Sequence, residues 1–269
     1  MKQTPTLKKT LQPALLTLGA MLAAVIVVIA QPDISEREFY ELREYHISSE
    51  AQKKQLTDYL KNAEIPALNR LGIKAVGVFE EIEPGDEQVV YMFIPFNKLE
   101  DVYSIHSKLM SDKKYVKAAG TEYLEAPKDK PAFTRIKSSL LVNFVSMPAY
   151  DIPDTKAPKS ERVYELRSYQ SYSENKGLAK IHMFDEGGET EIFKRLGFNA
   201  VFYSQALIGH ERPNLVYMTT FDNMDDRNKH WDSFRTDAAW DKLKVKEEYK
   251  DTVSKNNTHL LRPMEFSQI

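Results

Sequence analysis

Tyr40-Glu41-Leu42-Arg43-Glu44-Tyr45 returns 124 residues later as Tyr164-Glu165-Leu166-Arg167-Ser168-Tyr169. Both runs are rich in residues that favour β-strands, and each is followed by a segment with helical spacing of apolar residues. Further landmarks recur at separations of 125 or 126 residues: Arg70-Leu71-Gly72 with Arg195-Leu196-Gly197, Asp112 with Asp237, and Val90-Tyr91-Met92 with Val216-Tyr217-Met218. Matches at such regular separations indicate an internal duplication of the sequence.

Each copy predicts the same order of elements: a strand, a helix, a β-hairpin, a second helix and a last strand. In the first copy we expect strands at 39–46, 73–82, 88–95 and 138–145, and helices at 48–71 and from Asn97 onward. In the second copy we expect strands at 163–169, 198–207, 214–221 and near His259, and helices at 173–196 and 225–249. Pro66 and Gly187-Gly188 should interrupt the first helix of each copy. This β-α-β-β-α-β order is the ferredoxin-like unit of the α+β class.

The duplication divides the chain into four segments. We expect a signal segment at 1–30, a first ferredoxin-like unit at 38–146, a proline-bearing linker at 147–161 and a second unit at 162–269. In the first segment three lysines precede an uncharged apolar run, Ala14 to Ala30, which is typical of a secretory leader. Cleavage after Ala30 would give an exported protein, periplasmic or secreted. The alternative is a membrane anchor formed by residues 11–30, because the apolar run is at the lower limit for crossing a bilayer.

Composition excludes several classes of function. Lysine and arginine number 37 against 39 acidic residues, with no run of like charge, so we expect no nucleic-acid partner. Cysteine is absent, which excludes disulfides, thiol catalysis and iron–sulfur clusters. No metal site and no cofactor are predicted, because the six histidines are scattered without metal-binding spacing: His46, His106, His182, His210, His230 and His259.

The landmarks resemble the NIPSNAP domain. They are the Tyr-Glu-Leu-Arg-x-Tyr strand, the Arg-Leu-Gly helix end, a hairpin strand with Val-Tyr-Met, and a helix carrying Trp231, Phe234, Asp237 and Trp240. The resemblance covers about residues 38 to 266 as two copies. The second copy fits better, because the first has His106, Leu109 and Tyr115 where those aromatic residues would fall.

The resemblance implies a dimeric α/β-barrel fold, in which two ferredoxin-like sheets face each other and close a barrel with helices outside. Here both sheets would come from one chain, and we expect a further homo-oligomer. The wider superfamily includes haem enzymes, cofactor-free oxygenases and plain binding or oligomerisation modules, so the fold selects no function. Through this resemblance, His106 or His230 would be the candidate axial ligand of a haem.

Strand geometry identifies six side chains as candidate ligand contacts. Because side chains alternate along a strand, Glu41, Arg43 and Tyr45 share one face while Tyr40 and Leu42 share the other. We expect the Tyr/Leu face to pack on the helices. The barrel interior would then be lined by Glu41, Arg43, Tyr45, Glu165, Arg167 and Tyr169. Enclosed charges must be paired or bound to a ligand, so the alternative to a ligand site is a salt-bridge network that fixes how the sheets meet.

Two functions stay open from the sequence. The first is a non-catalytic module that uses this Glu/Arg/Tyr-lined interior to bind a small anionic or aromatic ligand, or that serves as an interaction module. The second is an enzyme of cofactor-free oxygenase or isomerase type. In that case a tyrosine or glutamate would move a proton and an arginine would stabilise an anion. The sequence favours the non-catalytic module and assigns no catalytic residue.

Overall fold

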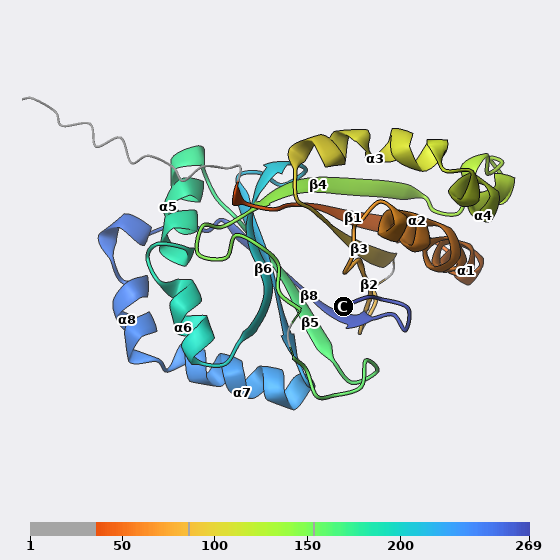
Figure 1. The fold of residues 1–269 in the computed structure, drawn as a ribbon. Helices are drawn as coiled ribbons and strands as arrows, with labels where there is room; N and C mark the ends of the chain where they lie inside the picture. Colours follow the sequence, from red (N-terminus) through yellow and green to blue (C-terminus); the bar gives the residue numbers. More distant parts are fainter. Residues whose placement is uncertain (1–35, 86, 153) are drawn as a thin grey trace, which may run out of the picture. The chain divides into compact units, whose positions relative to one another are not determined.

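The computed structural model describes residues 36–85, 87–152 and 154–269. The predicted signal or anchor segment, residues 1–30, lies outside these ranges. Within them, each half of the chain has the predicted order of strands and helices (Figure 1). No helix in the described part of the chain is both long and apolar enough to span a membrane.

The first unit consists of β1 (Phe39–Ile47), α1 (Glu50–Tyr59), a π-helical turn (Leu60–Glu64), α2 (Ile65–Arg70), β2 (Gly77–Glu81), β3 (Gln88–Phe96), α3 (Leu99–Ser111), α4 (Lys113–Leu124) and β4 (Arg135–Asn143). The second unit consists of β5 (Val163–Gln170), α5 (Glu174–Phe184), α6 (Glu189–Arg195), β6 (Asn199–Ile208), β7 (Asn214–Phe221), α7 (Met224–Arg235), α8 (Ala238–Lys244), a 3₁₀ turn (Glu247–Tyr249) and β8 (Lys255–Pro263). β2 starts four residues later than predicted, after Ala75, whose φ of 57° is not that of a strand. β4 starts three residues earlier, because the charged residues Arg135 and Lys137 pair with β1.

The eight strands close one antiparallel barrel in the order β1-β3-β2-β8-β5-β7-β6-β4. Each unit contributes the ferredoxin-like half-sheet, β4-β1-β3-β2 or β8-β5-β7-β6, and the halves join through β2 with β8 and β4 with β6. Closure removes every free sheet edge. The predicted intrachain α/β barrel is confirmed.

Local sequence explains the interrupted first helices. Ser49 caps α1, its side chain accepting a hydrogen bond from the backbone N–H of Gln52. Pro66, near the start of α2, has no N–H to donate, and the π-helical turn directly before it accommodates the missing bond. In the second unit the helix breaks at Gly188, whose φ of 97° favours glycine. Both predicted interruptions are therefore present.

The barrel interior is an apolar, aromatic core shared by both units. Phe93 of the first unit stacks on Phe202 of the second with ring centroids 5.1 Å apart, and Phe79 packs on Tyr164 at 4.9 Å. Around them lie Tyr40, Leu42, Leu141, Leu166, Met218 and Leu261, each no more than 5% exposed. The expected Glu/Arg/Tyr-lined interior is wrong, because the charged faces of β1 and β5 find ion-pair and hydrogen-bond partners on the helices, such as Glu64 and Arg227.

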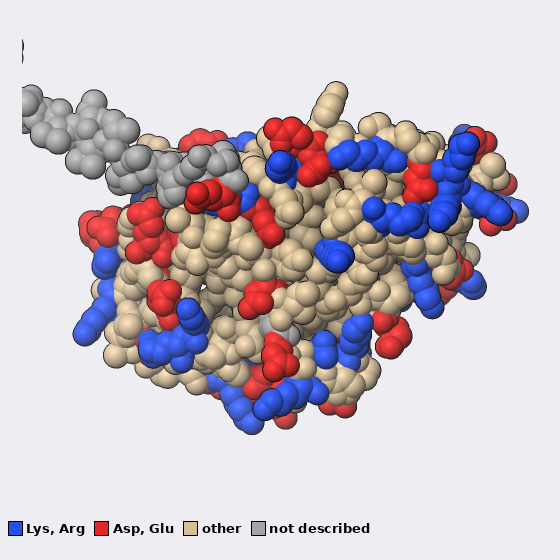
Figure 2. Space-filling view, in the orientation of Figure 1, with Lys and Arg blue, Asp and Glu red and all other residues tan. Residues whose placement is uncertain are grey.

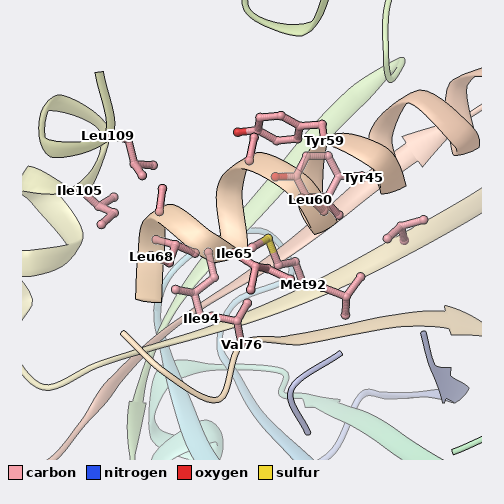
Figure 3. Close-up of a cluster of buried hydrophobic side chains, with 14 of the residues drawn as sticks. Tyr45, Tyr59, Leu60, Ile65, Leu68, Val76, Met92, Ile94, Ile105 and Leu109 are labelled. Carbon is pink, nitrogen blue, oxygen red and sulfur yellow. The ribbon is translucent and has the colours of Figure 1, made fainter. Parts of the chain in front are cut away.

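The opposite face of each half-sheet packs against that unit's own helices. In the first unit this layer contains Tyr45, Met92 and Ile94 from the sheet, with Leu60 and Leu68 from the helices (Figure 3). The second unit has a corresponding layer that includes Tyr169, Tyr217 and Trp231. The Glu/Arg/Tyr faces of β1 and β5 therefore lie under the helices.

The shared tripeptide of the hairpins does not occupy equivalent positions. Arg43 of β1 pairs with Met92, whereas Arg167 of β5 pairs with Tyr217. Tyr91 therefore faces the barrel interior, while Tyr217 faces the helices. The sequence match is one residue out of structural register, and a one-residue shift inverts the face of every side chain.

Candidate functional site

In the first unit, Arg43 joins two carboxylates between the sheet and the helices. Its guanidinium donates to both carboxylate oxygens of Glu41, at 2.7 and 2.8 Å, and to Glu64 at 2.7 Å. Glu64 ends the π-helical turn and is only 2% exposed. Burial disfavours the charged form of Glu41, but the bonds and charge of Arg43 outweigh it and lower the pKa. The three groups form a mutually paired network.

Aromatic side chains cover this network on its outer side. Tyr59 of α1 stacks on Tyr123 of α4, and its hydroxyl lies 2.8 Å from that of Tyr115. Tyr45 lies beneath them, and its hydroxyl accepts a hydrogen bond from Arg43 at 3.3 Å. Burial raises the pKa of Tyr45, Tyr59 and Tyr123, so these hydroxyls stay protonated at neutral pH. They can donate hydrogen bonds but cannot act as bases.

A groove of about 690 Å³ opens between α1 and α4, with Tyr59 and Tyr123 in its lining. The remaining lining residues are small or polar: Ala51, Lys54, Gln55, Asp58, Asn62, Ala118, Ala119, Glu122, Pro127 and Lys130. The volume lies in the range of pockets that hold small molecules. The groove thus shares Tyr59 with the aromatic residues that cover Arg43.

The second unit distributes its charges differently. Glu165 is fully buried and receives two bonds from Arg227, at 2.9 and 2.8 Å, and one from the Trp231 indole at 2.7 Å. Arg167 is 3.4 Å from Glu165, its guanidinium lies 4.4 Å from the Trp231 ring, and its Nε has no hydrogen-bond partner among the described residues.

A second buried ion pair lies in the same layer, between Lys180 and Glu189 at 2.8 Å. Burial raises the pKa of Glu189, although Lys180 opposes the shift. Nearby, the hydroxyls of Tyr169 and Tyr217 lie 2.9 Å apart, and burial raises the pKa of Tyr169 to about 12. Like the first unit, the second unit thus presents protonated tyrosines and paired charges under its helices.

The six predicted residues are thus gathered in two clusters rather than one. Glu41, Arg43 and Tyr45 lie under the helices of the first unit, and Glu165, Arg167 and Tyr169 under those of the second. Glu64, Arg227 and Trp231 are the helical partners of these residues, and their bonds fix helices to the half-sheet of the same unit. Ligand binding by these six side chains stays a prediction.

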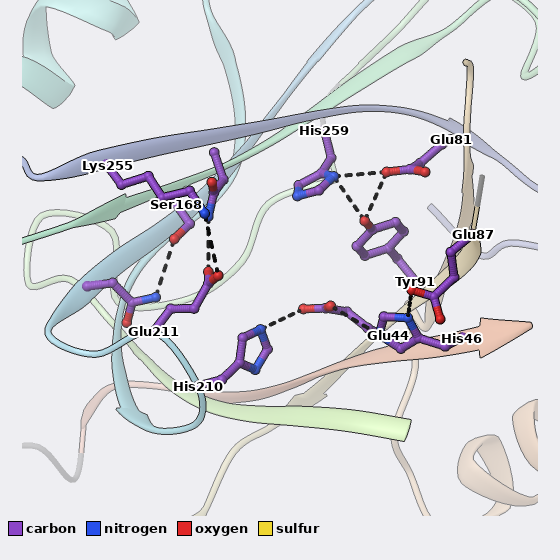
Figure 4. A network of polar contacts seen from close by, with 12 residues as sticks. Glu44, His46, Glu81, Glu87, Tyr91, Ser168, His210, Glu211, Lys255 and His259 are labelled. Atoms are coloured by element: carbon purple, nitrogen blue, oxygen red, sulfur yellow. Dashed lines mark hydrogen bonds and ion pairs between the residues drawn. The ribbon is translucent and has the colours of Figure 1, made fainter. Parts of the chain in front are cut away.

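One rim of the barrel carries a cluster that was not predicted (Figure 4). His259 Nδ1 lies 2.9 Å from Glu81 and 3.0 Å from the hydroxyl of Tyr91. We call the histidine rim the group Glu44, His46, Glu81, Glu87, Tyr91, His210 and His259. Strand alternation could have predicted this cluster. Glu44 and His46 share a strand face with Leu42, and His259 shares one with Leu261, so all three lie on the inward face if those leucines do.

The two histidines considered for haem lie elsewhere. His106 is exposed on α3, whereas His230 on α7 is bonded through Nδ1 to the carbonyl of Asp226 at 2.8 Å and packs on Phe198. Among the residues that the structure describes, no three His, Asp or Glu side chains are placed to hold a metal ion.

Replacing Arg43 with Met should cost about 3–5 kcal/mol of unfolding free energy, because it leaves Glu41 and buried Glu64 without their cation. Arg167→Met is the matched comparison. It should cost less than about 2 kcal/mol, since Glu165 keeps Arg227 and Glu189 keeps Lys180. Urea unfolding at neutral pH measures both. Equal losses in the two variants would contradict the different pairing of the two arginines.

The lowered pKa of Glu41 predicts how the stability contributed by this residue depends on pH. A carboxyl whose pKa is lower in the folded than in the unfolded chain stabilises the fold above the ordinary value of 4.5, and this contribution is lost as pH falls through the folded pKa. Glu41→Gln should therefore destabilise at pH 7 by about 1.5–3 kcal/mol, and by progressively less below pH 4.5. Urea unfolding across this pH range tests it. A difference that stays constant with pH would refute the assignment.

Comparison with known proteins agrees with this geometry. The family profile described as NIPSNAP matches residues 40–144 and 164–268, one match for each unit. No curated protein matches the chain.

Solved structures resemble the chain at low identity. A candidate monooxygenase from Fusobacterium nucleatum is 10% identical, with TM-score 0.52, over 85% of this chain and 93% of its own. One from Lactobacillus acidophilus is 12% identical, with TM-score 0.52, over 84% and 94%. A NIPSNAP family protein of unknown function from Agrobacterium tumefaciens is 21% identical over 41% of this chain and 96% of its own, with TM-score 0.36. At such identity the first two likenesses show the fold alone.

The two profile matches span most of the described chain, and the protein belongs to the NIPSNAP family as a tandem of two NIPSNAP domains closed into one barrel.

Proposed function

We propose that this NIPSNAP protein is a small-ligand-binding module and that its site is the groove between α1 and α4. The observation that carries the proposal is the groove itself, about 690 Å³ in volume and lined by the stacked pair Tyr59 and Tyr123. Stacked aromatic side chains offer a flat apolar surface with hydroxyls at its edge. Such a surface suits a small aromatic ligand.

Lys130 is the group that would hold an acidic part of that ligand, in a lining that also contains the carboxylates of Asp58 and Glu122. Lys130 lines the groove and has no ion pair among the described residues, whereas Lys54 is paired with Asp58. Lysine and arginine side chains are prominent over the region of α1 and α4, at the right of Figure 2. A carboxylate near Lys130 would gain a charge-assisted hydrogen bond.

At the matching place in the second unit the structure describes a buried tyrosine. Tyr249 lies 126 residues after Tyr123, but it is 5% exposed and its hydroxyl lies 2.8 Å from His182 Nδ1. A Cβ on Gly187 would come within 2.8 Å of that hydroxyl, so the tyrosine packs directly on the glycine. The duplication therefore retains a groove in one copy and fills it in the other, as expected when only one copy binds.

Acid–base chemistry finds less support than binding. The tyrosines beside the groove have raised pKa values, and Glu41 has a lowered one, so neither type of group is ready to exchange a proton near neutral pH. Arg43 is occupied by two carboxylates of the protein. The two similar structures described as candidate monooxygenases share the fold, and their chemistry does not transfer through the fold.

Isothermal titration with 2-naphthoate tests the groove. We expect one saturable site per chain, because the naphthalene ring can lie against Tyr123 while the carboxylate approaches Lys130. Lys130→Ala should weaken binding about tenfold, which corresponds to about 1.4 kcal/mol. The cation 2-naphthylmethylammonium, which has the same ring, should bind more weakly than 2-naphthoate.

The matched control is Lys242→Ala, an exposed lysine on α8 of the second unit. It removes the same charge from the chain but should leave 2-naphthoate affinity unchanged. Absence of saturable binding would refute the proposed groove. Equal weakening by both lysine variants would show that only net charge matters, which would also refute it.

A further inference from the structure

Helix α3 presents an apolar stripe to the solvent. Tyr103 is 93% exposed, and Leu99 and Met110 are exposed as well. Because these residues are four and seven positions apart, they lie within about 40° of one another around the helix axis. Ile105 and Leu109, which are buried in the core of the first unit, lie on another face of the helix. The stripe is therefore additional to the face by which α3 packs on the protein.

Lysine side chains border this stripe where α3 meets α4. Ser107, one helical turn after Tyr103, lines a shallow depression together with Lys113 and Lys114 at the start of α4. Both lysines are exposed, and neither makes an ion pair among the described residues. Lysine and arginine side chains gather over α4 and the adjoining end of α3 (Figure 2). The apolar stripe thus continues into a basic surface.

This part of the first unit carries a net positive charge. Residues 98–117 contain five lysines and three acidic residues, which gives a net charge of +2. Two of the acidic side chains are already paired within the chain, Asp101 with Lys108 and Asp112 with Arg70. The other lysines therefore give this surface a positive potential that attracts anions.

The second unit shows that the fold does not require these residues. Its helices α7 and α8 match α3 and α4 at a separation of 125 residues, which is the distance between the capping residues Asp112 and Asp237. At that separation Asn228, Arg235, Ala238 and Ala239 stand in place of Tyr103, Met110, Lys113 and Lys114. Residues 223–242 contain four basic and five acidic residues, a net charge of −1. Packing of helices on a half-sheet therefore explains neither the stripe nor the lysines.

The charge and shape of this surface distinguish between possible partners. A second copy docked on the same surface by twofold symmetry would bring lysines of like charge together, which is unfavourable. A folded protein would need a pocket that matches the protruding side chain of Tyr103. The headgroup layer of a bilayer accepts a protruding tyrosine without such a pocket, and anionic headgroups attract lysines. The observations therefore favour an anionic lipid surface.

We propose that α3 and the start of α4 dock on an anionic lipid bilayer. Leu99, Tyr103 and Met110 enter the headgroup region, and Lys113 and Lys114 lie beside lipid phosphates. Such a contact combines the burial of a few apolar side chains with attraction to anionic lipid, so it is peripheral and sensitive to salt. None of these five residues lines the groove between α1 and α4, so the inference stands whether or not the groove binds a ligand.

Co-sedimentation of the full chain with vesicles tests this surface. One kind of vesicle contains phosphatidylcholine alone, and the other contains phosphatidylcholine with about 30% phosphatidylglycerol. We expect at least tenfold tighter binding to the mixed vesicles. Tyr103→Ser should weaken that binding about fivefold, because it removes the most exposed apolar side chain of the stripe. Lys113→Gln combined with Lys114→Gln should weaken it at least tenfold, since each lysine near an anionic surface contributes about fivefold.

Matched control variants come from the second unit. They are Tyr172→Ser, at an exposed tyrosine, and Lys194→Gln combined with Lys242→Gln, at two exposed lysines. Each should change the affinity for mixed vesicles by less than about twofold. Thermal unfolding of every variant separates loss of binding from loss of fold, and the comparison of the two vesicles uses the unaltered chain.

Three results would overturn the proposal. The first is equal binding to both kinds of vesicle, or to neither; equal binding is what an apolar anchor at residues 11–30 alone would give. The second is equal weakening by the control variants, because net charge would then explain the binding. The third is binding to soluble polyglutamate as tight as to mixed vesicles, which would identify an acidic polypeptide as the partner.

Discussion

Closure of the barrel is the constraint on which the remaining structure depends. Two four-stranded half-sheets share one interior, and that interior is sealed on all sides by strands. An unpaired charge inside would lose its hydration, so the interior side chains are aromatic and aliphatic, with Phe93 stacked on Phe202 across the two units. The charged faces of β1 and β5 must then lie outward, where helices can supply partners such as Glu64 and Arg227. The need of buried charges for partners is thus met on the same side of both repeated strands.

The architecture could be predicted because the duplication repeats whole elements. The Tyr-Glu-Leu-Arg-x-Tyr runs, Pro66 and Gly188 placed strands and helix breaks correctly, since these signals are local. Which face of each strand points into the barrel could not be predicted from these local signals. Alternation gives two faces but does not say which one lines the barrel, and that depends on whether the barrel closes and on which helix residues reach the sheet.

Contacts between residues distant in sequence explain the other features that were not predicted correctly. The identical tripeptides around Tyr91 and Tyr217 suggested equivalent positions, but pairing with β1 and β5 sets them one residue apart. The histidines have no sequence spacing because His46, His210 and His259 come from β1, the turn after β6, and β8. Only closure brings them to one rim. The repeat pattern therefore does not mark this rim.

The two units differ in whether the layer between helices and sheet leaves a groove. In the first, Arg43 is fully occupied, and the tyrosines above it line a groove. In the second, Trp231 and Tyr249 fill the corresponding layer, and buried charges are held by Arg227 and Lys180. A duplicated barrel can thus use one copy for binding and the other for rigidity.

The claim that both units share one dry interior is tested most directly by a double-mutant cycle between Phe93 and Phe202. Replacing each with Leu, singly and together, and measuring unfolding free energies should give a coupling of about 0.5–1.5 kcal/mol, as for aromatic pairs in contact. Phe93 with Phe234, which belongs to the outer layer of the second unit, should be additive. Additivity within about 0.3 kcal/mol for Phe93 and Phe202 would contradict the shared interior.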